Sequence, residues 1–191
     1  MKRSTMIKAF ATVVAVAMLI PAGLQAMARG GDMTFTLTST AFRHMGPIPS
    51  AYTCEDRNIS PPLAWSHIPS GTKSLVLIVD DPDAPDPAAP KMTWVHWLLY
   101  NIPPSIDRLE EGAGIRPAQK PILEGLGSSN KTGYSGPCPP IGTHRYFHKL
   151  YALDTVLPDL SFPDEAALEV AMKGHILGKV LLIGTYKKTK P

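Results

Sequence analysis

The stretch Leu75-Val-Leu-Ile-Val-Asp-Asp-Pro-Asp-Ala-Pro85 joins an apolar run of strand length to an acidic turn that is held by prolines. A continuous apolar run of this length is typical of a strand that is buried on both faces, so Leu75–Val79 is predicted to lie at the centre of a sheet. An aspartate that directly follows such a strand lies next to the core, so its carboxylate is expected to need a partner within the protein. Prolines on either side of Asp83 fix the turn that carries it, although Asp-Pro-Asp is also common in purely structural turns.

The rest of the chain predicts further short strands. The alternating pattern of Met33–Ser39 is that of a half-buried strand, and a long loop is expected from about Arg43 to Pro69. A second long segment without clear periodicity, residues 103–142, is rich in Gly and Pro. Further strands are predicted at Trp94–Asn101, Tyr146–Asp154 and Val180–Tyr186, and one helix at Pro163–Leu177.

Composition supports this pattern. The chain has 191 residues, enough for one domain with a real core, and 20 of them are prolines, which rules out long helices over most of its length. We therefore expect a mainly β, or β-rich α+β, fold, and a β-sandwich in particular.

The first 28 residues have the pattern of a secretory signal peptide. A basic start, Lys2 and Arg3, precedes the apolar run Phe10–Ile20, and Ala26-Met27-Ala28 offers a small-residue cleavage site. A membrane span would need about 20 mostly apolar residues. We expect residues 1–28 to be removed, leaving a single domain at 29–191 in the periplasm or outside the cell; an uncleaved anchor is the alternative.

Removal of the leader changes the net charge of the chain. The whole chain carries +3, but the leader holds three of its 19 basic residues and none of its 16 acidic ones, so residues 29–191 are close to neutral. A neutral chain gives no electrostatic reason to expect nucleic-acid binding. No membrane span is expected after cleavage.

Two cysteines, Cys54 and Cys138, form an even pair in a chain that we expect to be exported. An oxidising compartment favours a disulfide between them. Two free buried thiols and an intermolecular bridge are the alternatives. The spacing fits neither a zinc ribbon nor a Cys-x-x-Cys redox motif.

Several side chains that can do chemistry stand at strand ends. His96 lies within a predicted strand between two tryptophans. His144 and Tyr146 are two residues apart at a strand start, so they should face the same side. An imidazole, a phenol and a rigid Gly/Pro loop, Gly136–Pro140, could together receive a phosphate-like anion. Each residue taken singly has a structural explanation.

Taken together, these segments carry a family resemblance. The chain resembles the phosphatidylethanolamine-binding protein family, also called Raf kinase inhibitor-like proteins, and in particular its bacterial and archaeal branch. The segments that carry the resemblance, in order, are Asn58–Trp65, Ile68–Ser74, Asp81–Pro85, Trp94–Trp97, Asn101–Pro103, Asn130–Tyr134, Gly136–Pro140, His144–Tyr146, Tyr151–Asp154 and Gly174–Leu177.

The resemblance implies an antiparallel Greek-key β-sandwich with one or two peripheral helices and a small anion pocket at one end of the sheets. In this picture His96 and His144 donate to the anion, and Asp81 orients an imidazole. The implied ligand-binding residues are Asp81, Asp83, His96, Gly136, Pro139, Pro140, His144 and Tyr146. Eukaryotic members have a C-terminal helix beside the pocket; the sequence stops soon after its last predicted strand, so a shallower pocket is expected.

Two classes of function follow. The first is a non-catalytic binding protein, without a cofactor, for phosphate, a phosphorylethanolamine-like head group or acetate, which could also inhibit or regulate a partner protein. The second is a metal-assisted hydrolase that uses the Asp/His cluster. No Ser or Cys nucleophile stands in a recognisable motif, so we favour the binding protein.

Overall fold

The computed structural model describes residues 34–115 and 118–189, which form two β-sheets and one α-helix. The predicted leader, residues 1–28, lies outside the described residues. The smaller sheet has the order β1-β3-β6, with strands Thr36–Thr38, Leu63–Ser66 and Arg108–Leu109. The larger sheet has the order β2-β9-β8-β4-β5-β7, with strands Gly46–Pro47, Ile176–Lys187, Thr143–Leu153, Ser74–Asp81, Trp94–Ile102 and Leu123–Glu124.

The larger sheet contains a Greek key. Strands β4, β5 and β7 are antiparallel neighbours, with β6 of the smaller sheet between β5 and β7 in the chain, and β8 then returns to the other side of β4, which gives the spatial order β8-β4-β5-β7. The pairing of β2 with β9 is parallel. The mainly β sandwich that the sequence predicts is therefore confirmed.

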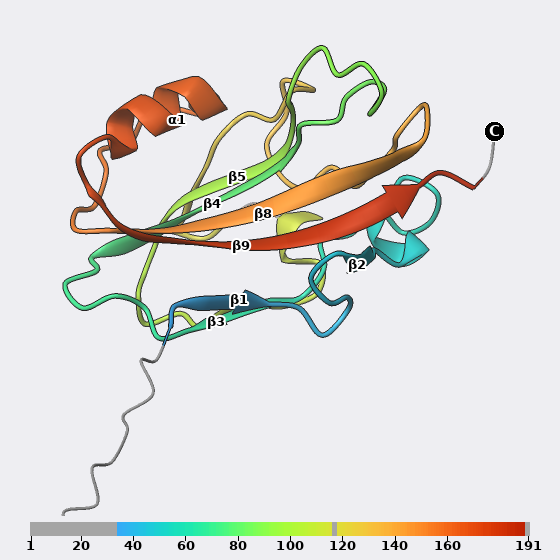
Figure 1. Ribbon diagram of the computed structural model, residues 1–191. Coiled ribbons are helices and arrows are strands. Elements are labelled where there is room, and N and C mark those ends of the chain that lie inside the picture. Colours follow the sequence, from blue (N-terminus) through green and yellow to red (C-terminus); the bar gives the residue numbers. More distant parts are fainter. Residues whose placement is uncertain (1–33, 116–117, 190–191) are drawn as a thin grey trace, which may run out of the picture. The chain divides into compact units, whose positions relative to one another are not determined.

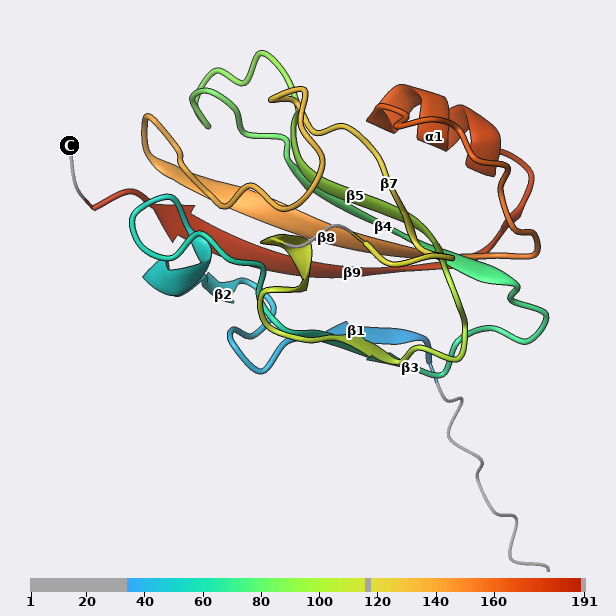
Figure 2. The same ribbon diagram turned by 180° about the vertical axis from the view of Figure 1, so that it is seen from behind.

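Strand β4 is central and buried along its whole length, as its apolar run predicts. Its side chains alternate between two hydrophobic clusters because successive residues of a strand point to opposite faces. Leu75, Leu77 and Val79 pack between the two sheets. Val76 and Ile78 pack on the other face, below helix α1, Glu165–Met172 (Figures 1 and 2).

The helix is shorter than the predicted Pro163–Leu177. Asp164 caps its start by accepting a hydrogen bond from the backbone N–H of Ala167 at 2.8 Å. The helix ends at Met172, and Gly174 has a φ of +85°, which turns the chain back. Ile176 and Leu177 begin β9 instead of extending the helix. Leu168 and Met172 are the side chains that α1 buries against the sheet.

The two predicted loops also hold regular structure. Strand β3 lies within the expected loop 43–69 and alternates buried Leu63 and Trp65 with exposed residues. The remaining pieces in these loops are the two-residue strands β2, β6 and β7 and the 3-10 turns η1, Ser50–Tyr52, and η2, Ala113–Ile115. They are too short to leave a hydrophobic period in the sequence.

Candidate functional site

A pocket of about 290 Å³ opens where the ends of β4, β5 and β8 meet the loop 135–140. Apolar side chains make up most of its wall, and the ionisable groups at the wall are one aspartate and two histidines. The lining residues are Asp81, Ala84, Pro85, Met92, Trp94, His96, Ser135, Gly136, Cys138, Pro139, Pro140 and His144. A small apolar cavity with a few convergent polar groups is typical of a ligand site.

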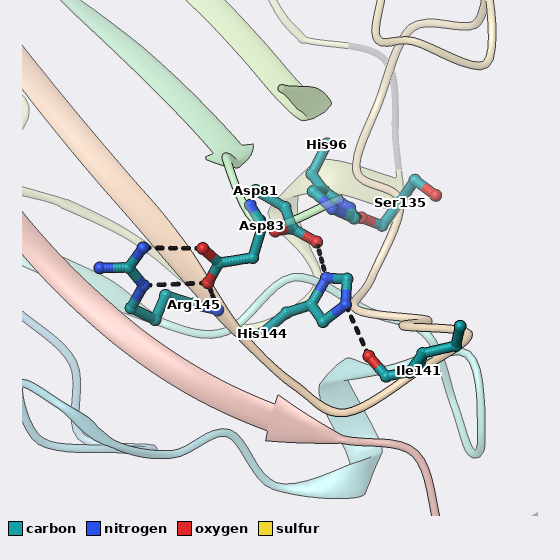
Figure 3. Close-up of polar contacts among 7 residues, drawn as sticks. All are labelled: Asp81, Asp83, His96, Ser135, Ile141, His144 and Arg145. Carbon is teal, nitrogen blue, oxygen red and sulfur yellow. Dashed lines mark hydrogen bonds and ion pairs between the residues drawn. The ribbon is translucent and has the colours of Figure 1, made fainter. Parts of the chain in front are cut away.

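His96, on β5, is 4% exposed and has one free ring nitrogen. Its Nδ1 lies 2.6 Å from the carbonyl oxygen of Ser135 (Figure 3). Because a carbonyl oxygen can only accept, Nδ1 carries a hydrogen and donates it. Nε2 is buried and makes no hydrogen bond with the described protein groups. Burial lowers the pKa of His96 below its ordinary value.

Asp81 and His144 form a closed pair on the neighbouring strands β4 and β8 (Figure 3). Nδ1 of His144 lies 2.6 Å from Oδ2 of Asp81, and Nε2 lies 2.9 Å from the carbonyl oxygen of Ile141. The carbonyl requires a hydrogen on Nε2, and a second hydrogen must lie between Nδ1 and the carboxylate. The pair is therefore neutral overall, whichever atom holds that second hydrogen.

This arrangement differs from the expectation that His144 donates to the ligand. Both of its ring nitrogens bind protein groups, since the Asp81 carboxylate takes one and the Ile141 carbonyl takes the other. Its imidazole borders the pocket but offers no N–H there. Asp81 holds this imidazole through the hydrogen bond at Nδ1.

Asp83 lies outside the pocket wall and binds Arg145 instead. Nη2 of Arg145 donates to Oδ1 at 2.7 Å, and both Nε and the backbone N–H donate to Oδ2 at 2.9 Å. These hydrogen bonds hold the pKa of Asp83 below its ordinary value. The backbone N–H of Asp83 donates to Oδ1 of Asp81 at 2.8 Å, so Asp83 positions the residue that orients His144.

Tyr146 lies behind the two histidines and faces the same side as His144, as the spacing predicts. Its ring stacks on His144, with centroids 6.4 Å apart, and meets His96 edge-on at 5.2 Å. Its hydroxyl is buried without a hydrogen bond to the described protein groups. Burial raises the pKa of Tyr146, which keeps the hydroxyl protonated.

The loop that carries the wall is tied to the segment 52–58. The predicted disulfide between Cys54 and Cys138 is confirmed, with Cα atoms 5.4 Å apart. The backbone N–H of Gly136 donates to Oδ1 of Asn58 at 2.8 Å. A Cβ on Gly136 would lie 2.5 Å from the carbonyl oxygen of Tyr52, so no larger residue fits here without a shift of the backbone.

Six of the eight implied site residues thus line one pocket, and two support it from behind. Sequence reasoning did not single out the main-chain carbonyls of Ser135 and Ile141, although they fix the hydrogens of both histidines. A backbone carbonyl acts through its position and has no side-chain signature. Arg145 lies within the segment His144–Tyr146 that carries the resemblance, but only its contact with Asp83 in the structure shows its role.

Comparison with known proteins agrees with this architecture. Residues 38–187 match the family model described as phosphatidylethanolamine-binding protein. A UPF0098 protein of Methanothermobacter thermautotrophicus is 49% identical over 156 residues, which cover 80% of this chain and 98% of that protein.

Two crystal structures share both fold and sequence with the chain. A phosphatidylethanolamine-binding protein homologue from Chlamydia trachomatis is 44% identical and has a TM-score of 0.73, covering 81% of this chain and 97% of its own. E. coli YbcL, described as a member of the mammalian PEBP family, is 28% identical with a TM-score of 0.73. The match covers 81% of this chain and 99% of YbcL.

Proposed function

This chain belongs to the phosphatidylethanolamine-binding protein family, and we propose that it is a non-catalytic binding protein whose pocket takes a small anion. The ligands that we propose are inorganic phosphate or a phosphorylethanolamine-like head group. Ligand oxygens would meet His96 at the wall of the pocket, while the apolar rest of the wall excludes water from the contact.

One observation carries this proposal: the buried Nε2 of His96 has no protein partner although the residue lines a pocket. Buried polar atoms are almost always hydrogen-bonded in folded proteins, so an exception in a cavity wall favours a ligand there. Tyr146, whose ring meets His96 edge-on, also has a buried hydroxyl without a partner among the described protein groups.

The hydrogen bonds that the two aspartates accept favour a binding protein over a metal-assisted hydrolase. The carboxylates of Asp81 and Asp83 already accept hydrogen bonds from His144 and Arg145. In the ranges 34–115 and 118–189, no group of three or more His, Cys, Asp or Glu side chains is placed to hold a metal ion. We therefore assign these carboxylates a positioning role and propose no hydrolytic step.

His96→Asn should weaken phosphate binding by roughly tenfold to a hundredfold. The asparagine amide can still donate to the Ser135 carbonyl, but nothing replaces Nε2, and a hydrogen bond to a charged group contributes about 1.5–3 kcal/mol. Calorimetric titration of inorganic phosphate and of phosphorylethanolamine into both proteins measures the change. His67→Asn, at an exposed histidine outside the pocket, is the matched control. If His96→Asn is folded and binds as tightly as wild type, the proposed site is wrong.

We further propose that the protein acts in the periplasm or outside the cell after its leader is cleaved. The Cys54–Cys138 disulfide supports this location because such bonds persist in oxidising compartments. Within the described residues, no helix is long and apolar enough to cross a membrane.

Export predicts a defined N-terminus. N-terminal sequencing of the protein from the extracytoplasmic fraction should begin at Arg29, since cleavage is expected after Ala28. Recovery of a chain that begins at Met1 from the cytoplasm alone would contradict export.

A further inference from the structure

The hydrogen positions around His96 limit what its pocket can offer to an anion. Nδ1 donates to the Ser135 carbonyl at 2.6 Å, so the hydrogen of a neutral ring is used there. Nε2 then presents a lone pair, which accepts a hydrogen bond and cannot donate one. A neutral His96 would therefore repel the oxygen of an anion that carries no hydrogen.

The neighbouring Asp81–His144 pair cannot supply the missing hydrogen. Its two hydrogens lie between Nδ1 and Oδ2 and between Nε2 and the Ile141 carbonyl. Oδ1 of Asp81 accepts from the backbone N–H of Asp83 at 2.8 Å, so both oxygens of this carboxylate already bind protein groups. The pair therefore presents no free N–H to the pocket.

The other ionisable groups around His96 lie outside the pocket wall. Asp80, on β4, forms an ion pair with Lys149. His148, on β8, is fully buried, and burial lowers its pKa to about 4, so it is neutral at neutral pH. Tyr146 keeps its proton because burial raises its pKa. Of the histidine ring nitrogens at the described pocket wall, Nε2 of His96 can take up a proton without losing a hydrogen bond to the protein, since the others already bind protein groups.

We propose that an oxyanion enters this pocket together with one proton, which lies between Nε2 of His96 and a ligand oxygen. This inference rests on the proposed anion-binding function and deepens it. With the proton in place, His96 becomes an imidazolium that donates from both nitrogens, to Ser135 on one side and to the ligand on the other. Burial lowers the pKa of His96 in the free protein. A buried anion within hydrogen-bond distance favours the charged imidazolium and so raises this pKa again.

Proton uptake predicts which class of anion binds best and how the affinity depends on pH. A basic oxyanion such as a phosphomonoester dianion attracts the shared proton more strongly than a weakly basic one such as sulfate. Since the complex holds one proton more than the separated partners, affinity increases as pH falls. With complete uptake, the dissociation constant rises about tenfold between about pH 7 and about pH 8.

Calorimetry in two buffers with different ionisation enthalpies counts the proton directly. Phosphorylethanolamine is a suitable probe at about pH 7.5 because the second pKa of a phosphomonoester is about 6, so its phosphate carries no proton of its own. The difference in observed enthalpy between the buffers should correspond to the uptake of about one proton per ligand bound. Binding with the same enthalpy in both buffers overturns the proton-coupled mechanism and leaves the proposed function standing. Absence of binding overturns both.

His96→Gln tests whether this residue holds the proton. The glutamine side-chain amide places a permanent, non-titrating N–H close to the position of Nε2. The variant should still bind phosphorylethanolamine, with a dissociation constant that stays constant between about pH 7 and about pH 8 and with no proton uptake. Uptake equal to that of wild type would place the proton elsewhere and contradict the assignment to His96.

Discussion

Replacing both Cys54 and Cys138 with serine should lower the free energy of unfolding by about 4–5 kcal/mol. The disulfide closes a loop with a sequence separation of 84 residues, and in the chain-entropy model a closure of this size restricts the unfolded chain by about that amount. Urea-induced unfolding of the oxidised wild type and of the double variant measures the difference. A loss below about 1 kcal/mol would show that the hydrogen bonds between the two loops suffice to hold them.

Those hydrogen bonds should preserve the fold of the double variant. The backbone N–H of Cys54 donates to the Pro137 carbonyl at 3.1 Å, and the Tyr134 hydroxyl donates to the Tyr52 carbonyl at 2.8 Å. Neither bond requires the sulfur atoms. Reduced wild-type protein is the matched control, since it loses the bridge without any substitution and should unfold at a similar urea concentration.

Asp81→Ala should cost about 2–6 kcal/mol of stability, because it leaves two buried polar groups unpaired and each such group costs about 1–3 kcal/mol. The alanine leaves Nδ1 of His144 and the backbone N–H of Asp83 without their acceptor, and both lie in buried surroundings. Urea-induced unfolding again gives the measurement.

Asp81→Asn is the matched control because its amide can replace the carboxylate atom for atom. Oδ1 still accepts from the Asp83 N–H, and Nδ2 can donate to Nδ1 of a neutral His144, whose Nε2–H still reaches the Ile141 carbonyl. We expect this variant to lose no more than about 1.5 kcal/mol, the usual net contribution of one hydrogen bond. An equal loss in both variants would contradict the proton positions that we assign to the pair.

The sequence predicts the central sheet well because burial on both faces leaves a strong local signal. Leu75–Val79 shows this best: five consecutive apolar side chains alternate between two separate clusters, so each of them has to be apolar. The sequence predicts too long a helix because Ile176 and Leu177 continue its apolar pattern, whereas Gly174 turns the chain and β9 begins at Ile176. Local patterns do not distinguish the last turn of a helix from the first residues of a strand.

The site shows a similar division. Asp81, His96 and His144 come together from three strands, as the resemblance implies. The family motifs do not indicate where each hydrogen lies. Those positions depend on the carbonyls of Ser135 and Ile141, which any residue could supply. Asp83 and Tyr146 were placed in the pocket because their motifs surround it, yet Arg145 draws Asp83 away and the two histidines lie in front of Tyr146.

Nitrogen NMR of histidine-labelled protein at about pH 7.5 tests the central claim most directly, because it reports the protonation of Nε2 in His96 itself. His96→Asn, which removes one signal, assigns the resonance. The account predicts an unprotonated Nε2 in the free protein and a protonated one at saturating phosphorylethanolamine, while exposed His67 stays unchanged. An Nε2 resonance of His96 that does not respond to saturating ligand would contradict the account.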